Sequence, residues 1–322
     1  MKLKILICAL IVSLTFTPQP CRASIAELDV EVKTAGLSLR SGVVFARYDT
    51  WPSAELKMDI FSPFDNNNNN NQKHPAVILI PGGAWIDANR EAVSNLAVKF
   101  AENDFVAAGI EYRLIGAASY EEIIGDAKAA VRYLRAHADE LNIDNNKIAV
   151  MGFSAGGYLA SMLGVTGGVN KFTFGDNLNQ SSEVQAVIDC FGPSDLTRIA
   201  EDYSEEKRKL YYSPASFISL FVNGVAVYKN NKGGSVLDTP ETARDANPLN
   251  YIDEHTPPFL IFHGDADKTV SLSQSKLLHD ELVKRNVPAD LYVIKGGEHN
   301  TVYFHQPEVF KIILEFLNRV LK

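Results

Sequence analysis

A serine, two aspartates and a histidine, each placed just after an apolar segment, are the residues of this chain that could do chemistry together. Ser154 lies in residues 152–156, Gly-Phe-Ser-Ala-Gly, which follow the apolar run 148–151 and precede a run of small residues. This Gly-x-Ser-x-Gly pattern predicts a strand, a sharp turn and a helix, with the serine hydroxyl exposed at the turn. A side chain at either glycine position would collide with the neighbouring strand or helix, and glycine avoids that collision. Ser154 is therefore the predicted nucleophile.

The predicted partners of Ser154 lie further along the chain. A serine hydroxyl is a weak nucleophile near neutral pH, so it needs a base, and the base needs an acid that orients it. The apolar run 258–263 leads into Asp265 and Asp267, and the run 291–294 leads into a glycine-rich loop with His299. The order serine, acid, histidine is the order of proteins built around this turn. We predict His299 as the base and one of the two aspartates as the acid.

Each of these residues also has a plainer explanation. An aspartate after a strand is commonly a turn or helix-capping residue, and a single histidine in a loop is commonly solvated. His263, at the end of a predicted strand, is predicted to be structural rather than the base. The agreement of three weak signals in order and context favours the catalytic interpretation.

An acyl-transfer site also needs donors for the oxyanion. The apolar run 76–80 is followed by residues 81–85, Pro-Gly-Gly-Ala-Trp. In proteins with this nucleophile turn, one donor is the amide after the serine, here Ala155, and the other comes from such an early loop. We therefore expect residues 81–85 to approach the nucleophile rather than form an ordinary turn.

With these segments in place, the chain resembles the α/β-hydrolase superfamily, and within it the acetyl-esterase and feruloyl/xylan-esterase-like branch related to hormone-sensitive lipase. The resemblance implies Asp267 rather than Asp265 as the acid, and oxyanion amides at Gly83, Ala84 and Ala155. The chain departs from most relatives at Pro81, where they have histidine, and at Ala84, where they have glycine. The similar segments span roughly residues 45–322 and comprise 81–85, 111–114, 126–134, 152–157, 191–196, 263–270 and 297–299.

Alternating strand and helix patterns predict the fold that the resemblance implies. Buried strands separated by helices form a mostly parallel central sheet with helices on both faces, the α/β class and here the α/β-hydrolase fold. An antiparallel pair is predicted first, at 43–48 and 55–61, with the asparagine-rich segment 66–71 as a flexible loop after it. Further strands are predicted at 76–80, 105–111, 148–151, 184–190, 258–263 and 291–294, and helices at 91–102, 120–141, 155–160, 272–285 and 307–321.

Residues 197–248 interrupt this alternation and are predicted to be a lid-like insertion, because long insertions in enzyme folds commonly bind substrate. The insertion is rich in aromatic residues, which either pack the insertion itself or offer flat surfaces to sugar or feruloyl groups. Tyr211, Tyr212 and Trp85 are the candidate substrate contacts. Since the insertion is distant in sequence from Ser154, the acid and His299, we expect it to affect substrate choice more than chemistry.

Composition and the N-terminus describe the context in which such a site would work. The chain has 322 residues, 46% of them hydrophobic, which suits one large domain. Its net charge of −8 argues against nucleic acid or anionic membranes as partners. A basic start, the apolar run 5–16 and small residues before Ser24 predict a cleaved signal peptide at 1–23, leaving a catalytic domain at 24–322 without a membrane span. Cleavage would leave Cys190 as the only cysteine and a net charge of about −11.

The sequence therefore predicts a secreted or periplasmic serine hydrolase that cleaves carboxylic esters and needs no metal or organic cofactor. The resemblance favours short acyl groups, acetyl or feruloyl, on a small molecule or a plant polysaccharide. Two alternatives stay open: an amidase or exopeptidase with the same catalytic residues, and a non-catalytic ligand-binding protein on the same fold.

Overall fold

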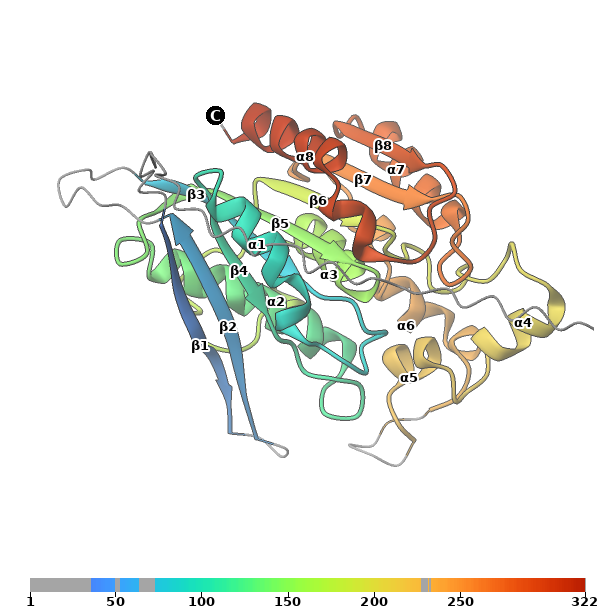
Figure 1. The fold of residues 1–322 in the computed structure, drawn as a ribbon. Helices are drawn as coiled ribbons and strands as arrows, with labels where there is room; N and C mark the ends of the chain where they lie inside the picture. The colour runs from blue at the N-terminus through green and yellow to red at the C-terminus, as the bar shows by residue number, and fades with distance from the viewer. Residues whose placement is uncertain (1–35, 50–52, 64–72, 227–230, 232, 322) are drawn as a thin grey trace, which may run out of the picture. The chain divides into compact units, whose positions relative to one another are not determined.

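Eight strands form one sheet in the computed structural model, which describes residues 36–49, 53–63, 73–226, 231 and 233–321 (Figure 1). The predicted signal peptide and the asparagine-rich segment 66–71 lie outside the described residues. The order across the sheet is β1-β2-β4-β3-β5-β6-β7-β8. The strands are β1 (Leu37–Tyr48), β2 (Ala54–Pro63), β3 (His74–Ile80), β4 (Val106–Ile110), β5 (Ile143–Phe153), β6 (Ala186–Cys190), β7 (Phe259–Gly264) and β8 (Ala289–Ile294).

The sheet is mostly parallel, as predicted. β1 and β2 form an antiparallel pair, and β2 pairs antiparallel with β4. Every other neighbouring pair, from β4 through β3 to β8, is parallel. The carboxyl ends of strands β3 to β8 consequently lie along one edge of the sheet, which is where open α/β sheets bind ligands.

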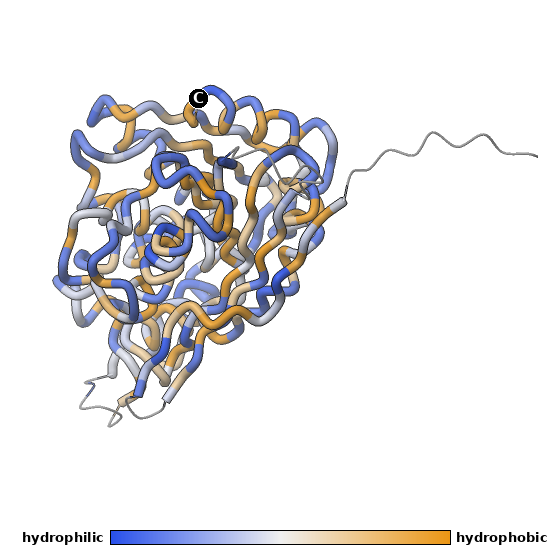
Figure 2. The backbone as a smooth tube through the Cα atoms, turned by 90° about the vertical axis from the view of Figure 1, so that its left-hand side faces the viewer, coloured by the Kyte–Doolittle hydropathy of each residue, from blue (hydrophilic) through white to orange (hydrophobic). Residues whose placement is uncertain are grey.

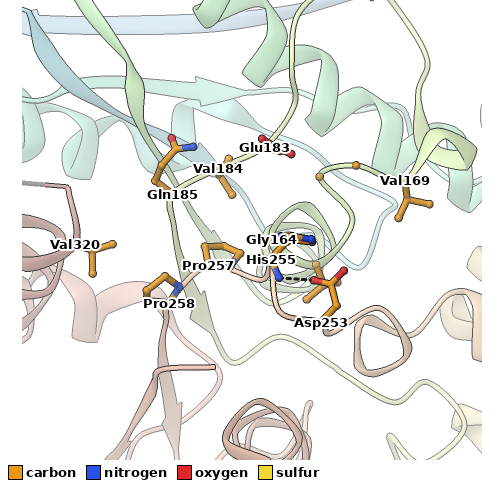
Figure 3. A pocket seen from close by; sticks show the side chains of 13 residues that line it. Gly164, Val169, Glu183, Val184, Gln185, Asp253, His255, Pro257, Pro258 and Val320 are labelled. Carbon is orange, nitrogen blue, oxygen red and sulfur yellow. Dashed lines mark hydrogen bonds between the residues drawn. The ribbon is translucent and has the colours of Figure 1, made fainter. Parts of the chain in front are cut away.

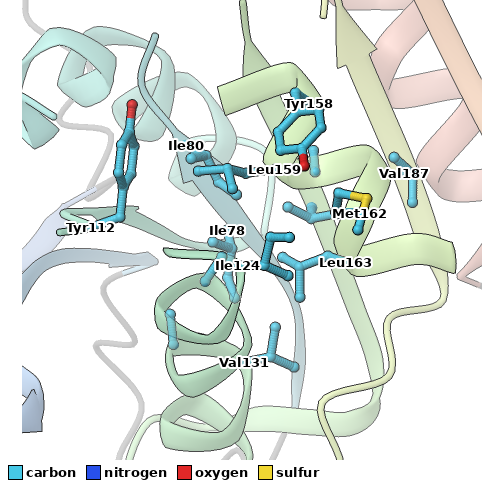
Figure 4. Packing of buried hydrophobic residues seen from close by; sticks show 14 of the residues in the cluster. Ile78, Ile80, Tyr112, Ile124, Val131, Tyr158, Leu159, Met162, Leu163 and Val187 are labelled. Carbon is cyan, nitrogen blue, oxygen red and sulfur yellow. The ribbon is translucent and has the colours of Figure 1, made fainter. Parts of the chain in front are cut away.

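Helices cover both faces of the sheet, and the alternation of strand side chains explains why. In β3, Ile78 and Ile80 face one hydrophobic cluster, whereas Val77 and Leu79 face the other. The first cluster is covered by α2 (Tyr120–Ala136), α3 (Ala155–Val165) and α7 (Leu272–Lys284), and the second by α1 (Ser94–Ala101) and α8 (Pro307–Val320). Figure 4 shows Ile78 and Ile80 beside side chains of α2 and α3. In Figure 2 the tube of α8 alternates between orange and blue, as expected of a helix with one buried face.

The predicted helix at 120–141 is shorter in the structure. It begins as predicted, because Ser119 and Glu122 cap each other's backbone amides at its N-terminus. It ends at Ala136, and the backbone then turns through Asn142, which has a φ of 55°. Ala138 and Leu141 are buried although they lie beyond the helix, so their apolar spacing continued the helical pattern past its true end.

The insertion at 197–248 consists of short helices, α4 (Glu205–Tyr211), α5 (Phe217–Asn223) and α6 (Pro240–Asp245), with 3₁₀ turns at Val236–Asp238 and Pro248–Asn250. Each α-helix in it spans only about two turns, so packing rather than helix propensity must hold it in place. In the described part of the chain, no helix combines the length and the apolar character needed to cross a bilayer.

Candidate active site

Ser154 occupies a strained turn between β5 and α3. Its φ is 54° and its ψ is −119°, a backbone conformation that a non-glycine residue adopts only where the surrounding structure imposes it. A Cβ on Gly152 would lie 2.0 Å from the carbonyl oxygen of Gly156, and a Cβ on Gly156 would lie 2.2 Å from that of Ile80. The two glycines of the motif therefore let the helix start directly against the sheet, with the serine at the tip.

His299 connects Ser154 to an aspartate through two short hydrogen bonds. Its Nε2 lies 2.8 Å from Ser154 Oγ, and its Nδ1 lies 2.6 Å from Asp267 Oδ2. A neutral imidazole that donates from Nδ1 to the carboxylate has Nε2 free to accept the serine proton. The tertiary structure thus brings together three predicted site residues that are 145 and 32 positions apart in sequence.

The two aspartates after β7 have different partners. Asp267 is buried, and its Oδ1 accepts hydrogen bonds from the amides of Thr269 (2.7 Å) and Val270 (3.0 Å), which orient Oδ2 toward the histidine. Asp265 is exposed, and its Oδ1 accepts a hydrogen bond from the Gly296 amide (2.6 Å). Asp267 is therefore the carboxylate in contact with His299, while Asp265 ties the loop of the acid to the loop of the histidine.

The surroundings of Asp267 keep its carboxyl ionised. Burial acts to raise its pKa, but hydrogen bonding to His263 and His299 outweighs burial and holds the pKa well below its usual range. His263 is fully buried, donates from Nε2 to the Val270 carbonyl (2.9 Å) and accepts at Nδ1 from Ser275 Oγ (2.7 Å). Its Nε2 also lies 3.4 Å from Asp267 Oδ2, so His263 packs behind the acid and is separated from Ser154 by the acid and His299.

The loop after β3 lies against the nucleophile. A Cβ on Gly82 would lie 3.2 Å from the Cβ of Ser154. Three consecutive residues of the loop have positive φ: Gly83 (139°), Ala84 (51°) and Trp85 (59°). Among the described residues, no backbone carbonyl accepts a hydrogen bond from the amides of Gly83, Ala84 or Ala155. These three predicted oxyanion donors are therefore free to bind a ligand oxygen.

Tyr112 braces this loop, and the sequence reasoning did not single it out. Its buried hydroxyl lies within hydrogen-bond distance of the carbonyls of Pro81 (3.2 Å) and Asp87 (3.1 Å), one at each end of the loop. Residue 81 is a proline and has no polar side chain, so in this chain Tyr112 supplies the polar contact to the loop. The only signal in the sequence was the tyrosine in the 111–114 segment of the resemblance.

Trp85 is a core residue, which corrects its assignment as a substrate contact. Its side chain is 1% exposed. The indole stacks on Phe221 of the insertion, with ring centroids 4.0 Å apart, and meets Tyr158 edge-on at 5.3 Å. The positive φ at Trp85 turns the ring down into the interior, so it has no free face for a sugar or feruloyl group.

Tyr211 and Tyr212 have backbone hydrogen-bond partners, and their role as substrate contacts stays a prediction. The Tyr211 hydroxyl donates to the Thr269 carbonyl (2.7 Å) in the loop of the acid. The Tyr212 hydroxyl accepts from the Ala200 amide (3.2 Å), and its side chain lines a surface pocket with Arg208. Both rings are half-buried within the insertion and bonded to backbone, so their hydroxyl groups serve packing and support.

A cavity of about 800 Å³ elsewhere in the protein is separate from this site (Figure 3). Gln185 and Pro258, which precede β6 and β7, line it together with Val165 at the end of α3. It therefore opens at the amino ends of the strands, whereas Ser154, Asp267 and His299 follow carboxyl ends. In the described residues, no group of three His, Cys, Asp or Glu side chains could hold a metal ion, in this cavity or elsewhere.

Asp189 of β6 is a second buried carboxylate near the nucleophile turn. It is fully buried, and its oxygens accept hydrogen bonds from the Gly192 amide (2.8 Å) and Ser161 Oγ (2.9 Å). It holds the turn whose Cys190 carbonyl accepts the Ser154 amide proton (2.9 Å). Burial raises the pKa of Asp189 to about 6, against these two hydrogen bonds, which act to lower it.

This raised pKa predicts a pH-dependent difference between the protein and Asp189→Asn. The folded state holds the Asp189 proton up to about pH 6, whereas the unfolded chain releases it near 3.8. Between those values the folded state binds more protons, so Asp189 makes the protein less stable as pH rises. The free energy of unfolding of Asp189→Asn, relative to that of the unmodified protein, should therefore rise by on the order of 2 kcal/mol from pH 4 to pH 7. Urea unfolding of the unmodified protein and of Asp189→Asn at each pH unit measures this difference. Free energies of unfolding that change in parallel with pH would contradict the prediction.

Comparison with known proteins places the chain in a family. Residues 58–282 match the family model BD-FAE, which covers more than half of the chain and includes Ser154 and Asp267. Among curated relatives, Esterase LipC of Mycobacterium tuberculosis is 31% identical over 210 residues, 65% of this chain and 48% of LipC. A probable isoprenylcysteine alpha-carbonyl methylesterase of Arabidopsis thaliana is 25% identical over 252 residues, 78% of this chain and 50% of the relative. The chain spans about half the length of these curated relatives.

Solved structures share most of this architecture. A truncated carbohydrate esterase from gut microbiota has a TM-score of 0.73 and 25% identity, covering 88% of this chain and 95% of its own. A bifunctional GH43-CE protein of Bacteroides eggerthii has a TM-score of 0.73 and 26% identity, covering 88% of this chain and 35% of its own. The sheet order, the nucleophile turn and these matches agree: the chain has an α/β-hydrolase fold and belongs to the BD-FAE family.

Proposed function

We propose that this protein hydrolyses carboxylic esters, with Ser154, His299 and Asp267 as its catalytic triad. The observation that carries the proposal is the chain of hydrogen bonds from Ser154 Oγ through His299 to Asp267, with lengths of 2.8 and 2.6 Å. A serine on a strained turn, a neutral imidazole that accepts its proton and a carboxylate held ionised are what acyl transfer requires. The esterase names of the curated relatives support the same reaction class.

The reaction proceeds in two halves. Ser154 Oγ attacks the ester carbonyl carbon while His299 Nε2 takes the hydroxyl proton, and the charge on the carbonyl oxygen is stabilised by the amides of Gly83, Ala84 and Ala155. The tetrahedral intermediate collapses, and His299 gives its proton to the departing alcohol. Water then attacks the acyl-serine with His299 as base, and the carboxylic acid leaves as Ser154 regains its proton. Asp267 stabilises the imidazolium in both halves.

The proposed substrate class is a short acyl ester, acetyl or feruloyl, carried by a plant polysaccharide or a fragment of one. The carbohydrate-esterase titles of two similar structures support a sugar-linked substrate. An amide substrate is the competing proposal, because the same triad cleaves amides.

A substrate panel tests the proposal. Purified protein is assayed on p-nitrophenyl acetate and octanoate, acetylated xylan fragments, a feruloylated oligosaccharide and an aminoacyl anilide, with Ser154→Ala protein as the background control. We expect turnover of the acetyl ester and of at least one sugar-linked ester, well above turnover of the octanoate and the anilide. Faster cleavage of the anilide than of every ester would replace the esterase proposal with the amidase one.

We also propose that the protein is exported and that its mature form starts near Ser24. The basic start and the apolar run 5–16 of the sequence support this. N-terminal sequencing of protein isolated from the medium or periplasm of its host tests it. Intact protein that keeps Met1 in the cytoplasmic fraction would contradict export.

A further inference from the structure

Helix α4 of the insertion is attached to the loop that carries the triad acid. The ammonium group of Lys207 donates to the Lys268 carbonyl, and the hydroxyl of Tyr211 donates to the Thr269 carbonyl at 2.7 Å. Two residues further on, Ser271 Oγ donates to Asp202, which precedes α4. The segment 202–211 is therefore hydrogen-bonded to three of the four residues of the loop 268–271, namely Lys268, Thr269 and Ser271.

The two carbonyls that α4 binds belong to the peptide groups that hold the acid. The carbonyl of Lys268 and the amide of Thr269 form one peptide group, and that amide donates to Asp267 Oδ1 at 2.7 Å. The carbonyl of Thr269 and the amide of Val270 form the next, and that amide donates to the same oxygen at 3.0 Å. Each peptide group thus relays a hydrogen bond from a side chain of α4 to the carboxylate.

Such relays strengthen the bond at the carboxylate end. A donor at a peptide carbonyl polarises the group and makes its amide a better donor, and a cation does so more strongly than a hydroxyl. The Lys207 ammonium is itself confined, since it lies 3.5 Å from the ring centroid of Tyr203 and 5.4 Å from that of Tyr211. The geometry also fixes the plane of both peptide groups, and hence the direction in which Asp267 presents Oδ2 to His299.

We propose that Lys207 and Tyr211 are positioning residues for the triad acid, so that the insertion supports the proton relay. This proposal rests on the proposed function of Ser154, Asp267 and His299. It differs from the expectation from sequence that the insertion affects substrate choice more than chemistry. Because both relays start from α4, the triad reaches full strength only with α4 bound to the loop 268–271.

The test uses Tyr211→Phe and Lys207→Met, each with a matched control. Tyr251→Phe also removes a tyrosine hydroxyl that donates to a backbone carbonyl, that of Asp245 (2.8 Å). Lys209→Met also removes a lysine of α4, but one paired with Glu205 on the surface. On p-nitrophenyl acetate we expect kcat to fall about three- to tenfold in each test variant, with KM unchanged, because one hydrogen bond in the relay is lost. The controls should stay within 1.5-fold.

A second readout does not depend on catalysis. The low-field proton resonance of His299 Nδ1–H reports the bond to Asp267, and it should shift or broaden in both test variants and stay in place in both controls. An unchanged resonance with unchanged kcat would overturn the proposal. So would a raised KM for xylan fragments with an unchanged resonance, since that result makes the two residues substrate contacts. If the protein cleaved no ester, the proposed function would fail. The resonance would still show whether Lys207 and Tyr211 position Asp267. Because Tyr211→Phe keeps the ring, it carries the test if Lys207→Met fails to fold.

Discussion

Ser154→Ala should abolish ester hydrolysis, lowering kcat by a factor on the order of 10⁴ or more, with the protein still folded. The serine oxygen is positioned to form the acyl intermediate, since His299 Nε2 faces it at 2.8 Å and can take its proton. Alanine retains the Cβ that fits beside Gly82. The hydrogen bond from the backbone amide of residue 154 to the Cys190 carbonyl does not involve the side chain, so it is retained as well. Initial rates on p-nitrophenyl acetate and a thermal unfolding curve measure the two effects.

Covalent labelling gives this prediction an independent control. A fluorophosphonate should attach to the unmodified protein at Ser154, identified by peptide mapping, and should leave Ser154→Ala unlabelled. If the variant kept an activity within tenfold of that of the unmodified protein, or if the label were found on another serine, the assignment of Ser154 as the nucleophile would be wrong. Labelling without turnover of any substrate would instead direct the search toward other acyl groups.

Asp267→Asn should lower kcat nearly as far, by a factor on the order of 10⁴, without unfolding the protein. The structure determines how the new amide must lie. The amides of Thr269 and Val270 donate to Oδ1, so the asparagine oxygen stays there and its NH₂ group faces His299. The histidine then has to accept at Nδ1 and carry its proton on Nε2. In that tautomer it has no lone pair for the proton of Ser154.

The neighbouring aspartate supplies the matched control. Asp265→Asn keeps an oxygen that can accept from the Gly296 amide, and the residue is exposed, so kcat should change by no more than about threefold. Steady-state kinetics of both variants on one ester make the comparison. If Asp265→Asn were the damaging change and Asp267→Asn the mild one, the assignment of the acid would be wrong by two residues.

Much of the fold could be predicted from local patterns. The antiparallel pair at the start, the parallel strands and the helices between them appear where their apolar periodicities place them. Boundaries were less predictable: Ala138 and Leu141 continue the pattern of α2 because the core buries them, although the helix ends at Ala136. Burial sets the periodicity, while hydrogen bonding sets the end of a helix.

The segments that carry the candidate site could also be predicted from the sequence, because the site is built on local turns. Gly152 and Gly156 are required by contacts within a few residues of Ser154 or with the adjacent strand, and such requirements leave a motif. The loop with His299 follows a strand in the same way. The sequence by itself thus determined the nucleophile turn, the chain order of the three residues and the type of sheet that carries them.

Only the tertiary structure decided what surrounds those residues. Trp85 is in the core because Phe221, more than a hundred residues later in the chain, stacks on it. The sequence around an aromatic residue in a loop does not indicate which distant residue it will pack against. The residue spacing left Asp265 and Asp267 as alternatives and only the resemblance favoured Asp267, whereas the structure shows the Asp267 carboxylate in contact with His299. The contact of Tyr211 with the Thr269 carbonyl has the same origin. These contacts join segments far apart in the chain, and their geometry depends on the packing of every element between them, which no local spacing encodes.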